Sequence, residues 1–233
     1  MKIGFRLGSI VAFGIAIAAW GQQGVPPTPK PADSGPTLAA TLQFIQEKLS
    51  EQGKVGWAET YTNQPGATYR HFVLVADVMA DPAACTLFLT EAVDQNVDIA
   101  KGTVLSVGGK QVSAEDFRIH VVETESISFK RVEKITVEKR QDLLNKALAE
   151  AAHPDIKVTV TPSVFLVMLS ASDAVFSEHS STTKGSQAPV EKDGTSKTNV
   201  LTFRDEETAN RVAKAMTHAM ELCGGGVTKK EVF

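Results

Sequence analysis

LTFRDEETANRVAKAMTHAMELCGG, residues Leu201–Gly225, is the stretch that decides how this chain ends its fold. Residues Val200–Arg204 read as a strand, and Asp205 then offers a side-chain oxygen to the first turn of a helix. Apolar residues recur at helical spacing as far as Cys223, while charged ones fall on the other side. This pattern predicts an amphipathic helix over Asp205–Cys223 that packs one face on a sheet.

Two further helices are predicted upstream. Residues Thr37–Gln52 place an apolar stripe on one face, and Gly53 follows as a closing residue. Residues Gln141–Ala152 consist mainly of strong helix formers. Between the helices lie short segments of β-branched and aromatic residues that alternate with polar ones, which is typical of strands. The predicted strands are 55–60, 70–78, 85–91, 117–122, 126–130, 156–161 and 164–169, with Ile135 and Val137 continuing the same sheet.

The predicted fold class is therefore α+β. We expect a bent antiparallel sheet or a small barrel, closed by the C-terminal helix and accompanied by an N-terminal helix.

The N-terminus has the features of a secretory signal peptide. Lys2 and Arg6 precede an uncharged apolar run, and small residues flank Trp20 at the expected cleavage region. We expect a signal peptide over 1–21, a Pro-rich linker over 22–36, an α+β domain over 37–226 and a tail over 227–233. The apolar run is shorter than the ~20 residues of a membrane span. The sequence thus predicts an exported protein, periplasmic or extracellular, with no stable membrane anchor after cleavage.

Composition and charge narrow the class of partner. The chain has 233 residues, 22% of them charged, with a formal net charge of −3. Removing the signal peptide makes the charge slightly more negative, since Lys2 and Arg6 leave with it. This balance gives no reason to expect nucleic acid or an anionic membrane as partner. The sequence does not identify the partner, and another protein of the cell envelope is the candidate.

The chain holds two cysteines, Cys85 and Cys223. Export favours a disulfide, because disulfides form and persist outside the cytosol. Cys85 begins a predicted strand and Cys223 lies on the inward stripe of the last helix, so the two could meet. Two buried thiols are the alternative, and both interpretations stay open at this point.

The segment Ala171–Lys197 is rich in Ser, Thr, Lys and Gly and shows no convincing periodicity. A connection of this length is typical of functional or disordered loops. We therefore expect a binding loop, with candidates at Ser177, His179, Lys184 and Lys192. Deleting Ser177–Gly194 should then leave thermal unfolding nearly unchanged and reduce partner capture. The run Ser177–Ser181 contains acid, base and nucleophile types, but adjacent residues cannot form a catalytic triad.

The closing strand and helix, Leu201–Gly225, resemble those of exported bacterial proteins of unknown function that hold a pleckstrin-homology-like barrel. The similarity takes in the strand at Cys85 and covers about 68–225. It implies a barrel with one open end plugged by the terminal helix, and it brings no catalytic residues. The chain departs from such a barrel through the Gln141–Ala152 helix and the Ala171–Lys197 insertion.

Motifs of catalysis and metal binding are missing from the sequence, including H-E-x-x-H, C-x-x-C, G-x-S-x-G and a complete P-loop. We expect no catalytic residues, no cofactor and no metal. The leading hypothesis is a non-catalytic binding or scaffold module. The alternatives are a hydrolase built from dispersed His, carboxylate and Ser residues, and a carrier of a small apolar ligand.

Overall fold

The computed structural model describes residues 35–107, 110–114, 118–153 and 155–226. The predicted signal peptide, the linker up to residue 34 and the tail 227–233 lie outside these residues. The chain divides after Gly35, and the description below concerns the unit that begins at Pro36. Within it the α+β prediction is confirmed, with a helix at each end of the unit and sheets that pair antiparallel.

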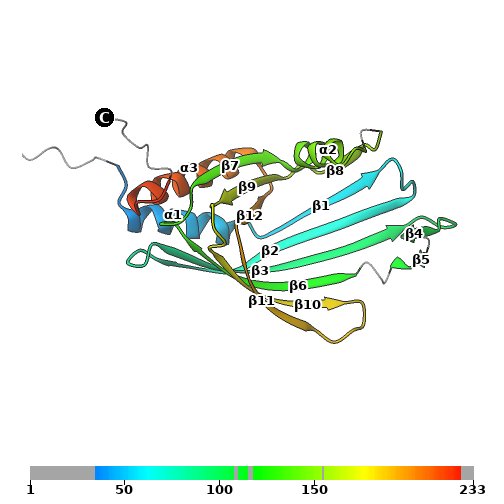
Figure 1. The fold of residues 1–233 in the computed structure, drawn as a ribbon, viewed down its shortest axis with the longest axis horizontal. Coiled ribbons are helices and arrows are strands. Elements are labelled where there is room, and N and C mark those ends of the chain that lie inside the picture. The colour runs from blue at the N-terminus through cyan, green and yellow to red at the C-terminus, as the bar shows by residue number, and fades with distance from the viewer. Residues whose placement is uncertain (1–34, 108–109, 115–117, 154, 227–233) are drawn as a thin grey trace, which may run out of the picture. The chain divides into compact units, whose positions relative to one another are not determined.

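The elements follow one another along the chain as strands interrupted by one internal helix (Figure 1). The helices are α1 (Leu38–Glu51), α2 (Arg140–Glu150) and α3 (Glu206–Leu222). The strands are β1 (Lys54–Tyr61), β2 (Ala67–Asp81), β3 (Thr86–Ile99), β4 (Leu105–Val107), β5 (Lys110–Val112), β6 (Ile119–Ser128), β7 (Lys134–Lys139), β8 (Val158–Thr161), β9 (Phe165–Ser170), β10 (Phe176–Lys184), β11 (Val190–Ser196) and β12 (Thr198–Phe203).

Two sheets carry most of the structure. The larger has seven strands in the order β11-β10-β6-β3-β2-β1-β8, and the smaller has three in the order β12-β9-β7. Strands β4 and β5 pair with each other alone. In the described residues no sheet closes on itself, so the expected small barrel is not found. The prediction that Ile135 and Val137 continue the main sheet is wrong, because β7 pairs with β9 in the smaller sheet.

The expected loop over Ala171–Lys197 is also wrong. Residues Phe176–Lys184 pair with β6 on one side and with β11 on the other, which makes β10 an internal strand and β11 the edge of the large sheet. Most side chains of β11 are exposed. An edge strand with solvent on both faces has no buried side, so its sequence need not alternate apolar and polar residues. Such a sequence resembles that of a loop.

Each of the helices at the two ends begins with a side-chain cap. The Thr37 hydroxyl accepts from the amide of Ala40 (3.3 Å), and the Asp205 carboxylate accepts from the amide of Thr208 (2.7 Å). Helices α1 and α3 lie beside each other, α1 against β2 and α3 against the smaller sheet (Figure 1). Their buried stripes join apolar residues of both sheets in the main core. That core contains Leu42, Ile45, Leu49, Leu87, Ile127, Phe129, Leu169, Phe203, Val212 and Met216, among others.

A disulfide joins the turn before β3 to the end of α3. Cys85 and Cys223 are bonded, and their Cα atoms lie 6.0 Å apart. The backbone around this disulfide is closely packed. The amide of Phe129 donates to the carbonyl of Cys85 (3.0 Å), and a Cβ on Gly225 would come within 2.2 Å of the Phe129 carbonyl. The end of α3 therefore has a fixed position against the core.

Candidate functional site

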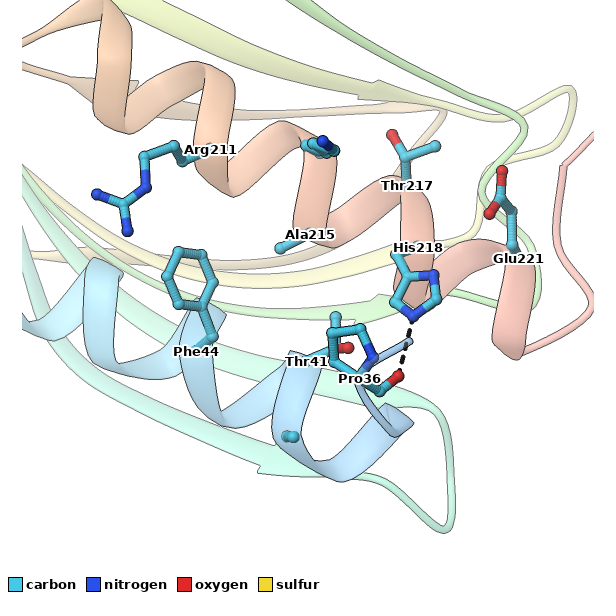
Figure 2. Close-up of a pocket in the computed structure, with 10 residues that line it drawn as sticks. Pro36, Thr41, Phe44, Arg211, Ala215, Thr217, His218 and Glu221 are labelled. Carbon is cyan, nitrogen blue, oxygen red and sulfur yellow. Dashed lines mark hydrogen bonds between the residues drawn. The ribbon is translucent and has the colours of Figure 1, made fainter. Parts of the chain in front are cut away.

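A hollow lies between the two end helices, and we call it the α1/α3 groove. Its volume is about 710 Å³, within the range of small-molecule sites. Figure 2 shows Phe44 and Thr41 on α1 facing Ala215 and His218 on α3 across this space. Pro36, Ala40 and Thr217 also line the groove, and its surface is mainly apolar.

Two cations stand at the rim of the α1/α3 groove. Arg211 and Lys214 are exposed side chains of α3 that line it, and the Arg211 guanidinium lies 5.5 Å from the centre of the Phe44 ring (Figure 2). Within the described part of the chain, no carboxylate forms an ion pair with either. Glu221, which lies further along α3 toward its C-terminus, also lines the groove. The rim near Phe44 is thus positive beside an apolar surface.

Two polar groups fix the other side of the groove. The ring nitrogen Nε2 of His218 and the carbonyl of Pro36 are hydrogen-bonded at 3.0 Å, which holds the start of α1 against α3 (Figure 2). The Thr41 hydroxyl is buried and has no partner in the described residues. An unpaired buried hydroxyl costs about 1–3 kcal/mol.

A second site is built around Glu59 on β1, whose side chain is only 3% exposed. Trp57 Nε1 donates to Glu59 Oε1 (2.8 Å), the Tyr61 hydroxyl donates to Oε2 (2.8 Å), and Arg140 Nε donates to Oε1 (2.9 Å). His71 Nε2 lies 3.6 Å from Oε2, beyond ordinary hydrogen-bond distance. The His71 ring stacks on Trp57 with centroids 5.1 Å apart.

This arrangement follows from the register of the strands. Trp57, Glu59 and Tyr61 alternate onto one face of β1, and Trp57 pairs with His71 of β2. Arg140 reaches the same face as the first residue of α2. The cluster therefore rests on three regular elements instead of on loops.

The protonation of the Glu59 cluster follows from its partners. Burial would raise the pKa of Glu59, but the side chains of His71 and Trp57 and the charge of Arg140 outweigh it and hold that pKa well below its usual range. Burial and the hydrogen bond to Glu59 raise the pKa of Tyr61. The carboxylate is thus ionised, with three donors on its two oxygens, and has no proton to give.

A polar hollow of about 520 Å³ opens beside this cluster, and we call it the Glu59 hollow. Among the described residues its lining contains no Ser, Thr, Cys or Lys, and its hydroxyl groups are those of Tyr61 and Tyr69. Its lining residues are Glu59, Tyr61, Asn63, Gln64, Tyr69, His71, Gln95, Arg140, Leu148 and Ile156.

Four glutamates form a third cluster on the large sheet. Glu91 of β3 pairs in register with Glu123 of β6, and Glu125 pairs with Glu178 of β10. Glu91 is 7% exposed, and its Oε1 has no partner in the described residues. Burial, together with the charges of Glu125 and Glu123, raises the pKa of Glu91 to about 8. Burial raises the pKa of Glu125 to about 7, although the Asn199 amide donates to its carboxylate.

The predicted binding residues lie on the β10–β11 hairpin. Ser177 and the other two candidates on β10, His179 and Lys184, share that strand, and Lys192 lies on β11. His179 Nδ1 is 2.7 Å from Asp193 Oδ1, and this contact raises the pKa of the exposed imidazole. Ser177 Oγ is 2.6 Å from Ser126 Oγ. Lys184 and Lys192 line a smaller hollow at the hairpin turn.

Sequence reasoning missed both larger hollows. For the α1/α3 groove, the helical pattern places Arg211 and Lys214 on the charged side of the last helix, but no local signal indicates that α1 lies beside them. For the Glu59 hollow a signal existed. The alternation Trp57-Glu59-Tyr61 puts a carboxylate between two aromatic residues on one strand face, which marks a buried polar cluster.

No group of His, Cys, Asp or Glu within the described ranges is placed to hold a metal ion. Of the helices that the structure describes, none has both the length and the apolar character needed to cross a membrane. In comparisons with protein-family models, with curated proteins and with solved structures, nothing matches this chain.

Proposed function

We propose that this chain is an exported, non-catalytic binding module whose ligand is a small amphipathic anion held in the α1/α3 groove. The observation that carries this proposal is the pairing of an apolar floor, built on Phe44 and Ala215, with two cations at its rim. Within the described residues these cations form no ion pair. A fatty acid of medium chain length has the matching chemistry. Its chain would cover the apolar floor and its carboxylate would meet Arg211 and Lys214.

The two parts of such a ligand contribute differently to the free energy of binding. Each apolar Å² removed from water contributes roughly 25 cal/mol, which favours any chain that covers Phe44 and Ala215. Hydrogen bonds to a charged group contribute about 1.5–3 kcal/mol, which favours an anion over a neutral analogue.

The proposal also includes export of the protein and its resemblance to proteins with a pleckstrin-homology-like barrel. The disulfide between Cys85 and Cys223 supports an oxidising compartment, because such bonds persist there. The resemblance of Leu201–Gly225 would make α3 the helix that closes the fold, and in this chain that same helix provides one wall of the α1/α3 groove.

The test is a titration with a dansyl-labelled fatty acid, followed by displacement with decanoate and with decanol. We expect an increase in dansyl fluorescence that decanoate reverses at lower concentration than decanol. Ala215→Trp should abolish binding by filling the groove, whereas Ala188→Trp, at the exposed hairpin turn, should leave it unchanged. Arg211→Ala and Lys214→Ala should each weaken binding by roughly tenfold or more.

Matched controls decide whether charge at the groove matters. Lys192→Ala removes a cation from β11, on a different surface, and should not change affinity. Equal binding by Ala215→Trp and the wild type would overturn the groove as the site. Equal displacement by decanol and decanoate would overturn the anionic head. If the protein binds an acidic, apolar peptide but no fatty acid, the groove is a protein-recognition site and the fatty-acid proposal is wrong.

A further inference from the structure

We propose that the Glu59 hollow is a second binding site, for a small uncharged polyhydroxyl ligand such as a mono- or disaccharide. This inference is independent of the amphipathic anion proposed for the α1/α3 groove. It rests on the charge balance of the hollow, on the unused hydrogen-bonding groups around it and on the rigidity of its floor.

Charge balance argues for a neutral ligand. The charged side chains that line the hollow are Glu59 and Arg140, and they are paired with each other at 2.9 Å. The Arg140 guanidinium also lies 5.6 Å from the Trp57 ring. A ligand carboxylate would compete with Glu59 for Arg140, and a ligand cation would compete with Arg140 for Glu59. Either exchange would break an ion pair whose carboxylate is buried, which is costly.

Amide side chains provide the unused hydrogen-bonding capacity. Within the described residues, the side-chain amides of Asn63 and Gln95 make no hydrogen bond. The carbonyl oxygen of Gln64 accepts from the Tyr69 hydroxyl, which leaves its NH₂ group to donate elsewhere. Each free amide has both donors and an acceptor. A sugar hydroxyl also donates and accepts, so a ring of hydroxyls is complementary to this set of amides.

Aromatic and aliphatic surfaces complete the hollow. Tyr61 and Tyr69 meet edge to face with centroids 5.7 Å apart, and Leu148 and Ile156 line the side toward α2 and the segment that follows it. A pyranose ring presents C–H groups on one face and hydroxyls around its rim. It can therefore contact the tyrosine and aliphatic surfaces while its hydroxyls reach the amides. The volume of about 520 Å³ is sufficient for a mono- or disaccharide.

The floor of the hollow is rigid before any ligand arrives. Glu59 is fixed by three donors from β1 and α2, and its neighbours Tyr69, His71 and Gln95 stand on paired strands. A preorganised site loses little entropy on binding. The Glu59 carboxylate acts as a positioning group here, since its oxygens are already occupied.

Saturation-transfer NMR on the full chain tests the proposal with glucose, galactose, maltose and cellobiose, with glucuronic acid as the charged counterpart and glycerol as the small polyol. At least one of the four neutral sugars should bind above glycerol and above glucuronic acid. Gln95→Ala and Gln64→Ala should each reduce its affinity roughly fivefold, the effect of one lost hydrogen bond. Gln187→Ala, at the separate hairpin hollow, is the matched control and should leave it unchanged.

Three results would overturn the inference: no neutral sugar binds above glycerol, glucuronic acid alone binds, or both hollow variants bind as the wild type does. Because the two alanine variants could alter folding, each is first compared with the wild type by urea unfolding. If one unfolds early, Gln95→Glu replaces it and should also weaken binding, because the carboxylate lacks the N–H donors of the amide. Addition of decanoate should not displace the sugar, because the α1/α3 groove is a different site.

Discussion

Replacing the buried Glu91 by glutamine should stabilise the protein, and the gain should grow with pH. The folded state raises the pKa of Glu91 from 4.5 to about 8, so between these values the folded chain binds a proton that the unfolded chain has lost. Stability is therefore unaffected by Glu91 below about pH 4.5 and falls as pH rises toward 8. Glutamine has nearly the same shape and never ionises.

The size of the effect follows from the same two values. Each pH unit between 4.5 and 8 costs the wild type about 1.4 kcal/mol, which comes to about 3 kcal/mol at pH 7. That corresponds to about a hundredfold in the folding equilibrium. Urea unfolding at pH 5, 6, 7 and 8, followed by the fluorescence of Trp57, measures this difference. The slope with urea should be the same in both proteins, because the surface exposed on unfolding does not change.

Glu150→Gln serves as the matched control, since Glu150 is an exposed acid at the end of α2. It should follow the wild type at every pH. The Glu91→Gln advantage should be small at pH 5 and largest at pH 8. An advantage of the same size at pH 5 and pH 8, or none at pH 7, would refute the reasoning that Glu91 is a buried acid held against Glu123 and Glu125.

Three further outcomes are expected from other parts of the structure. The double variant Cys85→Ala/Cys223→Ala should lose about 4 kcal/mol of stability because the closed loop spans a sequence separation of 138, and an unchanged urea midpoint would contradict this. Glu59→Gln should cost about 3 kcal/mol at pH 7. Since the Glu59 pKa is lowered in the fold, that cost should shrink as pH falls below 4.5, and an equal loss at pH 3 and pH 7 would count against the ion pair. Deleting Ser177–Gly194 should lower the melting temperature, because β10 pairs with β6. An unchanged melting temperature would show that the segment is a loop that does not stabilise the fold.

Helices were the most predictable part of this chain. The sequence indicated α1, α2 and α3 to within two residues at each end, since caps, periodicity and closing glycines are all local signals. The pairing of Cys85 with Cys223 was foreseeable for a different reason. Cys85 lies on the apolar face of a predicted strand, and Cys223 lies on the core-facing stripe of the last helix. The two cysteines can therefore meet once that helix packs on the sheet.

The division into two sheets could not be predicted in the same way. The alternation of β7 is the same whether it joins β6 or β9, because the pattern says which face is buried and not which strand is the neighbour. The candidate sites also depend on contacts between elements that are far apart in the sequence. The α1/α3 groove needs two helices separated by more than 150 residues to lie side by side, and the Glu59 hollow needs Arg140 to arrive beside β1.

The contact between Pro36 and His218 places the two ends of the described unit close to each other. Glu221, near the end of α3, lines the same groove as Pro36. A short flexible linker could therefore join residue 226 to residue 36, and new ends could be opened in the exposed turn between β10 and β11, at Gln187–Ala188. Such a circular permutant would keep every strand pairing intact. It would also carry a fused reporter at the hairpin, away from the α1/α3 groove.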